Sequence, residues 1–185
     1  MRRFLLVMTL AAGSAMIFGA DAPQAGMGKV LDDQIRSAER EIVGLAEAMP
    51  PDRYGFRPTA GEFKNVRSFS QQMTHIAAVL NGISAGALGE KNPSEMGKDE
   101  NGPASIADKT AAVKYLKDAF AYAHKAASAV TSSNAMDLLP SPFGNGKTSR
   151  INLVTELMWH SFDHYGQAVV YARMNGIVPP ASRGQ

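Results

Sequence analysis

The 185-residue chain contains no cysteine, which excludes disulfides, thiolate metal sites, a cysteine nucleophile and a lipoprotein anchor. Its net charge is only +2, and its lysines and arginines are scattered rather than clustered. The basic surface that nucleic-acid binding requires is therefore missing, and no nucleic-acid partner is expected. The sequence also has no phosphate-binding loop, no nucleotide fingerprint and no serine-centred triad signature.

No segment alternates apolar and polar residues in the manner of a β-strand, so the sequence does not predict a sheet. The hydrophobic content of 45% and the charged content of 19% are ordinary for a globular protein. A chain of this length can bury one hydrophobic core, and it shows no internal repeat. We therefore expect a single all-α domain.

The N-terminus has the features of a secretory signal peptide. A basic pair at residues 2–3 precedes the uncharged apolar run 4–18, and a small-x-small motif follows at 20–22. The run is shorter than the ~20 residues of a membrane-spanning helix. We interpret residues 1–22 as a signal peptide that directs export to the periplasm or beyond the cell. An uncleaved membrane anchor or an ordinary buried helix are the alternatives, and Pro23 leaves the cleavage point open.

Four stretches after a flexible segment at 23–29 carry apolar residues at alternating steps of three and four, which predicts amphipathic helices. The predicted helices span residues 30–49, 68–85, 106–131 and 150–175. Thr148 or Ser149 suits the N-cap of the last helix, and Gly176 suits its C-terminal stop. Each apolar stripe must be buried against a neighbour, so residues 30–180 are expected to form one four-helix bundle domain.

The predicted inward seam of the last helix becomes polar halfway along. The seam consists of Leu153, Leu157, His160, His164, Gln167, Tyr171 and Met174. Polar groups in a core are costly unless they are paired. Histidines four residues apart on one helix direct both rings into the same volume, which is the spacing of a metal-binding pair. His75, at the edge of the stripe of the second helix, would complete a three-histidine site if these two helices are neighbours.

Other interpretations of these histidines remain open. The pair could be an ordinary polar face, or the bundle could hold no metal and pair its histidines with other core groups. A haem site is disfavoured, because the chain has no CxxCH motif and three histidines exceed what such a site needs. Nitrogen ligands suit zinc, nickel, iron(II) or copper. His124 lies off the stripe of the third helix and is expected at the surface.

Two further side chains lie one turn from the histidine pair. Gln167 could orient a ligand or form a hydrogen bond across the core. Glu156 could hold an imidazole in one tautomer, or it could be a surface carboxylate. Arg57 could close over a pocket or pair with a carboxylate. The sequence singles out no catalytic residue.

Several motifs together resemble the DinB-like (DinB/YfiT) family. The run HSFDHYGQ at 160–167 resembles its HxxxHxGQ signature, and YARMNGIVP at 171–179 is similar to the family's next segment along the chain. YGFRP at 54–58 and SFSQQMTH at 68–75 resemble the family's loop and second helix. The resemblance extends over about residues 29–180.

This resemblance implies a four-helix bundle of DinB-like fold that binds one divalent metal, with zinc or nickel expected, through His75, His160 and His164. It also implies a homodimer. Some relatives look like metal-dependent hydrolases, and others transfer low-molecular-weight thiols in the cytosol, where this chain with its leader is not expected. We thus expect an exported protein that acts on an unknown small molecule through metal-activated water or thiolate. The alternative is a non-catalytic metal-binding or structural bundle of the cell envelope. A membrane is a partner only if the leader stays uncleaved.

Overall fold

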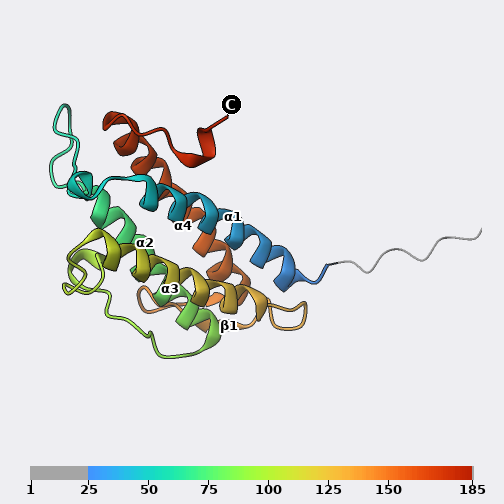
Figure 1. Cartoon of the computed structure of the whole chain (residues 1–185). Helices are drawn as coiled ribbons and strands as arrows, with labels where there is room; N and C mark the ends of the chain where they lie inside the picture. Colours follow the sequence, from blue (N-terminus) through green and yellow to red (C-terminus); the bar gives the residue numbers. More distant parts are fainter. Residues whose placement is uncertain (1–24, 185) are drawn as a thin grey trace, which may run out of the picture.

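The computed structural model describes residues 25–184, so the predicted signal peptide lies outside the described part of the chain. Four long helices lie side by side as a bundle (Figure 1). They are α1 (Met27–Ala48), α2 (Phe69–Leu88), α3 (Lys109–Ser128) and α4 (Arg150–Met174). The prediction of an all-α four-helix bundle is confirmed. Within the described residues, no helix is both long enough and apolar enough to cross a membrane.

Helix α2 packs against both α3 and α4. Helix α1 packs against α3 and α4 from the other side. Every residue from 72 to 85 of α2 is buried, so this helix has no exposed face over most of its length. The neighbouring positions of α2 and α4 provide the adjacency that a site shared by His75 and the α4 histidines requires.

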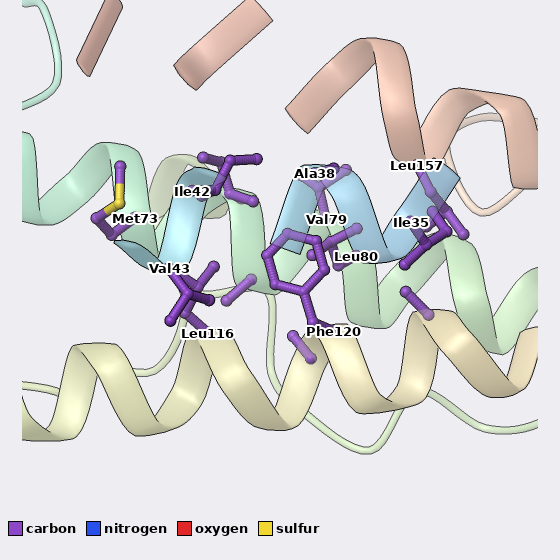
Figure 2. Close-up of a cluster of buried hydrophobic side chains, with 14 of the residues drawn as sticks. Ile35, Ala38, Ile42, Val43, Met73, Val79, Leu80, Leu116, Phe120 and Leu157 are labelled. Carbon is purple, nitrogen blue, oxygen red and sulfur yellow. The ribbon is translucent and has the colours of Figure 1, made fainter. Parts of the chain in front are cut away.

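The core consists of the apolar stripes that the sequence predicts. Figure 2 shows Ile35, Ala38 and Ile42 of α1 in a cluster with side chains from the other helices. Phe120 of α3 is one of the largest side chains in this cluster and is fully buried. Burial of such groups drives folding, at roughly 25 cal/mol per Å² of apolar surface.

The N-terminus of α1 differs from its prediction, because the helix begins at Met27 rather than at residue 30. Residues 27–29 were expected to belong to a flexible segment, but Gly28 in this stretch has a packing role. A Cβ on Gly28 would lie 2.7 Å from the carbonyl oxygen of Ser128 and 2.8 Å from that of Val130. The absence of a side chain therefore lets α1 approach the end of α3 closely.

Helix α3 is shorter than predicted at both ends, since it begins at Lys109 and ends at Ser128. Asp108 caps its N-terminus, where the carboxylate accepts a hydrogen bond from the backbone N–H of Ala111 at 2.8 Å. This cap explains why the helix does not begin at residue 106.

A short hairpin precedes α4 in a region for which the sequence predicts only an irregular loop. Strand β1 (Leu138–Pro140) pairs antiparallel with β2 (Lys147–Ser149). Three residues per strand are too few for a recognisable alternation, so the prediction of no strand was wrong here. Ser149 ends the hairpin and caps α4 by accepting from the N–H of Asn152, as predicted. Gly176, with φ of 74°, follows the helix as its predicted stop.

The inward seam of α4 departs from its prediction toward the C-terminus. Met174 is 52% exposed and Gln167 is also exposed, whereas Ala168 and Ala172 occupy the core. The predicted seam advances 3.5 residues per turn, but an α-helix has 3.6, so such a seam drifts by ~20° per heptad. His164 lies before the drift becomes large and remains buried.

Candidate metal centre

The structure brings His75, His160 and His164 together between α2 and α4. Each offers one ring nitrogen, and these three nitrogens lie within 4.8 Å of one another. The ring centroids are separated by 4.4 to 5.0 Å. A capping box formed by Ser68 and Gln71 determines where α2 begins, and His75 follows in its second turn. The three residues that the sequence predicts as ligands therefore face one common volume.

His75 is only 3% exposed, in contrast to the edge position that its stripe suggests. Its Nδ1 lies 2.8 Å from the backbone carbonyl oxygen of Glu100. A carbonyl only accepts, so Nδ1 carries the proton and Nε2 keeps a lone pair. Asp99 and Glu100 both have positive φ, 54° and 58°. These are unfavourable values for such residues, and they shape the loop that covers His75.

His164 is oriented by a glutamine that sequence analysis did not assign to the site. Its Nδ1 lies 2.7 Å from Oε1 of Gln72, which leaves Nε2 available for a metal. Nε2 of Gln72 donates to Oε1 of Gln167 at 3.1 Å. Gln167 thus acts on His164 only through Gln72. The signal for Gln72 was its position three residues before His75, on the same face of an otherwise apolar helix.

His160 has the least support of the three rings. Its Nε2 lies 3.2 Å from Nε2 of His75, and its buried Nδ1 has no hydrogen-bond partner among the described residues. Two imidazole nitrogens bound at about 2.0–2.1 Å to one tetrahedral zinc lie about 3.3 Å apart. The observed separation is therefore close to that of two ligands of one ion.

Glu156, one turn before His160, does not provide the missing partner. Within residues 25–184 it forms no hydrogen bond with any of the three histidines. Burial raises the pKa of its carboxyl above the ordinary value. Its role as a partner of His160 stays a prediction.

The histidine cluster has no charge at neutral pH. Burial lowers the pKa of His160 to about 3 and that of His164 to about 4, and it also lowers the pKa of His75. The positive charge of Arg67 contributes to the lowering at all three. Metals bind deprotonated imidazole, so these neutral rings are ready ligands. Three neutral nitrogen donors fit a divalent transition metal such as zinc or nickel.

A polar cavity of about 640 Å³ lies next to the cluster. Gln72 and Gln167 form part of its lining, whereas the three histidine rings do not. Arg57 also lines it and donates to Oε1 of Gln71 at 2.8 Å. Of the two roles considered for Arg57, the structure favours a place at the cavity. Arg67 lines the same cavity, and no sequence signal pointed to it.

The fourth histidine is not the surface residue that the sequence suggests. His124 of α3 is 20% exposed and joins α3 to α1. Its Nδ1 lies 2.5 Å from a carboxylate oxygen of Asp32, and its Nε2 lies 3.1 Å from one of Glu39. Both ring nitrogens therefore already have partners.

Comparisons with known proteins agree with the fold. The model of the DinB superfamily matches residues 34–168, a range that contains all three clustered histidines. Similar solved structures include a DinB-like protein from Bacillus cereus, with 16% identity and a TM-score of 0.66 over 82% of this chain and 95% of that one. A conserved protein from Enterococcus faecalis has 13% identity and a TM-score of 0.65, over 82% and 98%. A DinB-like protein from Bacillus subtilis has 18% identity and a TM-score of 0.57, over 80% and 92%. No curated protein matches the sequence.

Proposed function

This chain belongs to the DinB superfamily, and from that premise we propose that it is a metal-dependent enzyme acting on a small molecule. The metal would be one divalent ion bound by His75, His160 and His164. One observation carries the proposal: two buried imidazoles and one half-buried imidazole, all neutral, direct nitrogens into one volume without a carboxylate among them.

The surrounding residues prepare the rings for this role. The carbonyl of Glu100 holds the proton of His75 on Nδ1, and the amide of Gln72 does the same for His164. Both interactions turn Nε2 toward the common volume, and such partners of metal ligands support affinity. The ion would supply Lewis acidity, which activates water or a thiol as a nucleophile. Three protein ligands are the number typical of catalytic zinc sites.

The class of reaction depends on the cellular compartment in which the protein acts. We propose export through residues 1–22, which favours hydrolysis over transfer of thiols made for the cytosol. We also propose a homodimer, supported by apolar side chains on the outer face of α4, where Trp159 is 59% and Val170 is 52% exposed. Sedimentation of Val170→Glu beside the unchanged protein tests this part, since an unaltered dimer would place the interface elsewhere.

A non-catalytic metal-binding bundle is the second candidate, and the burial of two of the three ligands favours it. His75 and His164 are only 3% and 8% exposed, and the neighbouring cavity is bounded by the Gln72–Gln167 pair rather than by the rings. A structural site is closed by protein ligands, whereas a catalytic site keeps a position for exchangeable groups.

Metal content tests the proposal. Untagged mature protein should contain about one zinc or nickel ion per chain by elemental mass spectrometry. The variant in which His75, His160 and His164 are all alanine should contain none, while the control His124→Ala should retain the ion. Equal content in all three proteins, or none in any after incubation with zinc and nickel, would contradict the proposal. The cobalt-substituted protein then separates the two candidates. Addition of azide should change the visible spectrum of a site with an open position and leave that of a closed site unchanged.

A further inference from the structure

We propose that the polar cavity beside the metal centre binds an anionic group of the substrate through Arg57 and Arg67. The substrate class is then a small molecule that carries a carboxylate or a phosphate. This inference deepens the proposed metal-dependent function and rests on it. The cavity of about 640 Å³ has the size of a small-molecule site.

Arg67 is held in place by neutral acceptors. Its Nε donates to the side-chain oxygen of Asn101 at 2.9 Å, and its Nη2 donates to the backbone carbonyl of Asp99 at 2.7 Å. These bonds orient the guanidinium but do not neutralise its charge. Arg57 is similar, because its bond is to the neutral amide of Gln71.

Neither arginine forms an ion pair within 4.0 Å in the part of the chain that the structure describes. Asp99 is the acidic residue among those that line the cavity, and it is exposed. Two positive charges thus face one negative charge there. The first turn of α2, with Gln71 and Gln72, also lines the cavity, and the N-terminal end of a helix favours anions. A bound divalent ion would add further positive charge nearby.

The side chain of Gln72 separates the cavity from the metal centre. Gln72 lines the cavity and also accepts from His164 at 2.7 Å. Arg67 donates to the backbone carbonyl of Asp99, and the next residue, Glu100, accepts from His75 through its own carbonyl, so one loop joins Arg67 to the metal centre. An anion on the arginines would therefore anchor a small molecule whose remainder reaches the ion. Arginine binds planar oxyanions well, because its guanidinium can donate two parallel hydrogen bonds.

Isothermal titration with succinate and with inorganic phosphate, at constant ionic strength, tests this site. The titrations use metal-loaded protein and the triple histidine variant. Arg57→Gln and Arg67→Gln should each weaken binding of at least one probe by about 10-fold or more. Arg53→Gln is the matched control, since Arg53 lies in the same connecting segment, is exposed and pairs with Asp52 outside the cavity. It should leave binding unchanged. Arg57→Gln guards against misfolding, because Arg57 is exposed and its hydrogen bond is to Gln71.

The outcomes separate this inference from the proposed function. Loss of metal content in the unchanged protein contradicts the metal-dependent function, whereas the arginine dependence of anion binding can still be measured in metal-free protein. Binding that disappears in the triple histidine variant but is unaffected by both arginine variants would show that the anion simply ligates the ion, and would overturn the inference. If Arg53→Gln weakened anion binding as much as the other two variants, the effect would come from net charge alone, and this result would also overturn the inference. Preference for succinate or for phosphate identifies the anionic group.

Discussion

Two histidine clusters join pairs of helices in this bundle, and they use the same side chain in opposite ways. His124 joins α3 to α1, and carboxylates of Asp32 and Glu39 occupy both of its ring nitrogens. His75 and His164 join α2 to α4, and each has a neutral oxygen on Nδ1 only. The oxygen partners of the two clusters therefore differ in charge.

The difference shows what makes a histidine available to a metal. Carboxylates around His124 take up the hydrogen-bonding capacity of both of its ring nitrogens. A carbonyl or an amide oxygen fixes the tautomer without adding charge, so the second nitrogen keeps its lone pair. Burial then keeps the ring neutral. Identical residues on adjacent helix pairs thus form a hydrogen-bonded junction with carboxylates in one place and a candidate metal centre in the other.

The largest expected difference between the clusters is in stabilisation by metal. Zinc at about 1,000 times its dissociation constant should stabilise the unchanged protein by about 4 kcal/mol, or raise its Tm by roughly 10 °C. His160→Ala should abolish this shift, because it removes one of three ligands. His124→Ala should show the full shift in thermal unfolding. A shift lost in both variants would erase the distinction between the clusters.

The next effect concerns the neutral partner of His164. Gln72→Leu should weaken metal affinity by about 10- to 100-fold, because His164 loses the acceptor that orients its ring. Gln167→Leu should have a smaller effect, since Gln167 reaches the histidine only through Gln72. Competition titrations with a chromophoric chelator measure both affinities. Equal affinities for Gln72→Leu and the unchanged protein would mean that the tautomer is fixed by other groups.

Acid should destabilise the two clusters in different pH ranges. In the metal-free protein, the pKa of His160 is about 3 and that of His164 about 4, below the ordinary 6.5. Between pH 6.5 and these lowered values the unfolded chain binds protons that the folded chain does not. The contribution of the two rings to stability is therefore fully present above pH 6.5 and is lost as pH falls, to about 4 for His164 and about 3 for His160. Urea unfolding should show this slope, and it should flatten when His160 and His164 are both replaced by glutamine. Equal slopes in the unchanged protein and in the double variant would mean that His160 and His164 do not cause this pH dependence.

Asp32 should lose its contribution only at lower pH. Partial burial would raise the pKa of its carboxyl, but hydrogen bonds from His124 and Arg36 outweigh burial and hold the pKa below the ordinary 3.8. Its share of stability is therefore present above that value and is lost below it.

The smallest effect is the stability of the His124 cluster itself. His124→Ala should lower the free energy of unfolding by about 1 kcal/mol, because the bonds to Asp32 and Glu39 are only partly buried. The loss should be the same with and without metal, and it should shrink at high salt. Urea unfolding at two salt concentrations measures it, and a loss that depends on zinc would mean that the two clusters are coupled.

The sequence predicted most of the fold because burial leaves a periodic pattern. The stripes of α1 and α2 appear in the core as expected, and the cap at Ser149 and the stop at Gly176 are also found. The hairpin and the packing of Gly28 were missed, because both depend on contacts with distant segments rather than on local pattern.

The candidate site was predicted to a similar extent. The three histidines were identified by spacing and by family resemblance, but their partners were not. Glu100 lies 25 residues from His75, and Gln72 lies 92 residues from His164. Such pairings are determined by how the loops and helices meet, so no periodicity in the sequence encodes them.

The chain contains a single tryptophan, whose fluorescence should report on the bound metal. The ring of Trp159 lies edge-on at 6.1 Å from that of His160, between centroids. All tryptophan fluorescence of this protein therefore comes from a ring beside one of the three proposed ligands. An ion with a partly filled d shell, such as nickel, should quench the tryptophan emission when it is bound to His160. Zinc, with its filled d shell, should leave the emission intensity unchanged. The fold thus contains a fluorophore that should separate zinc from nickel, which the ligand set alone does not do.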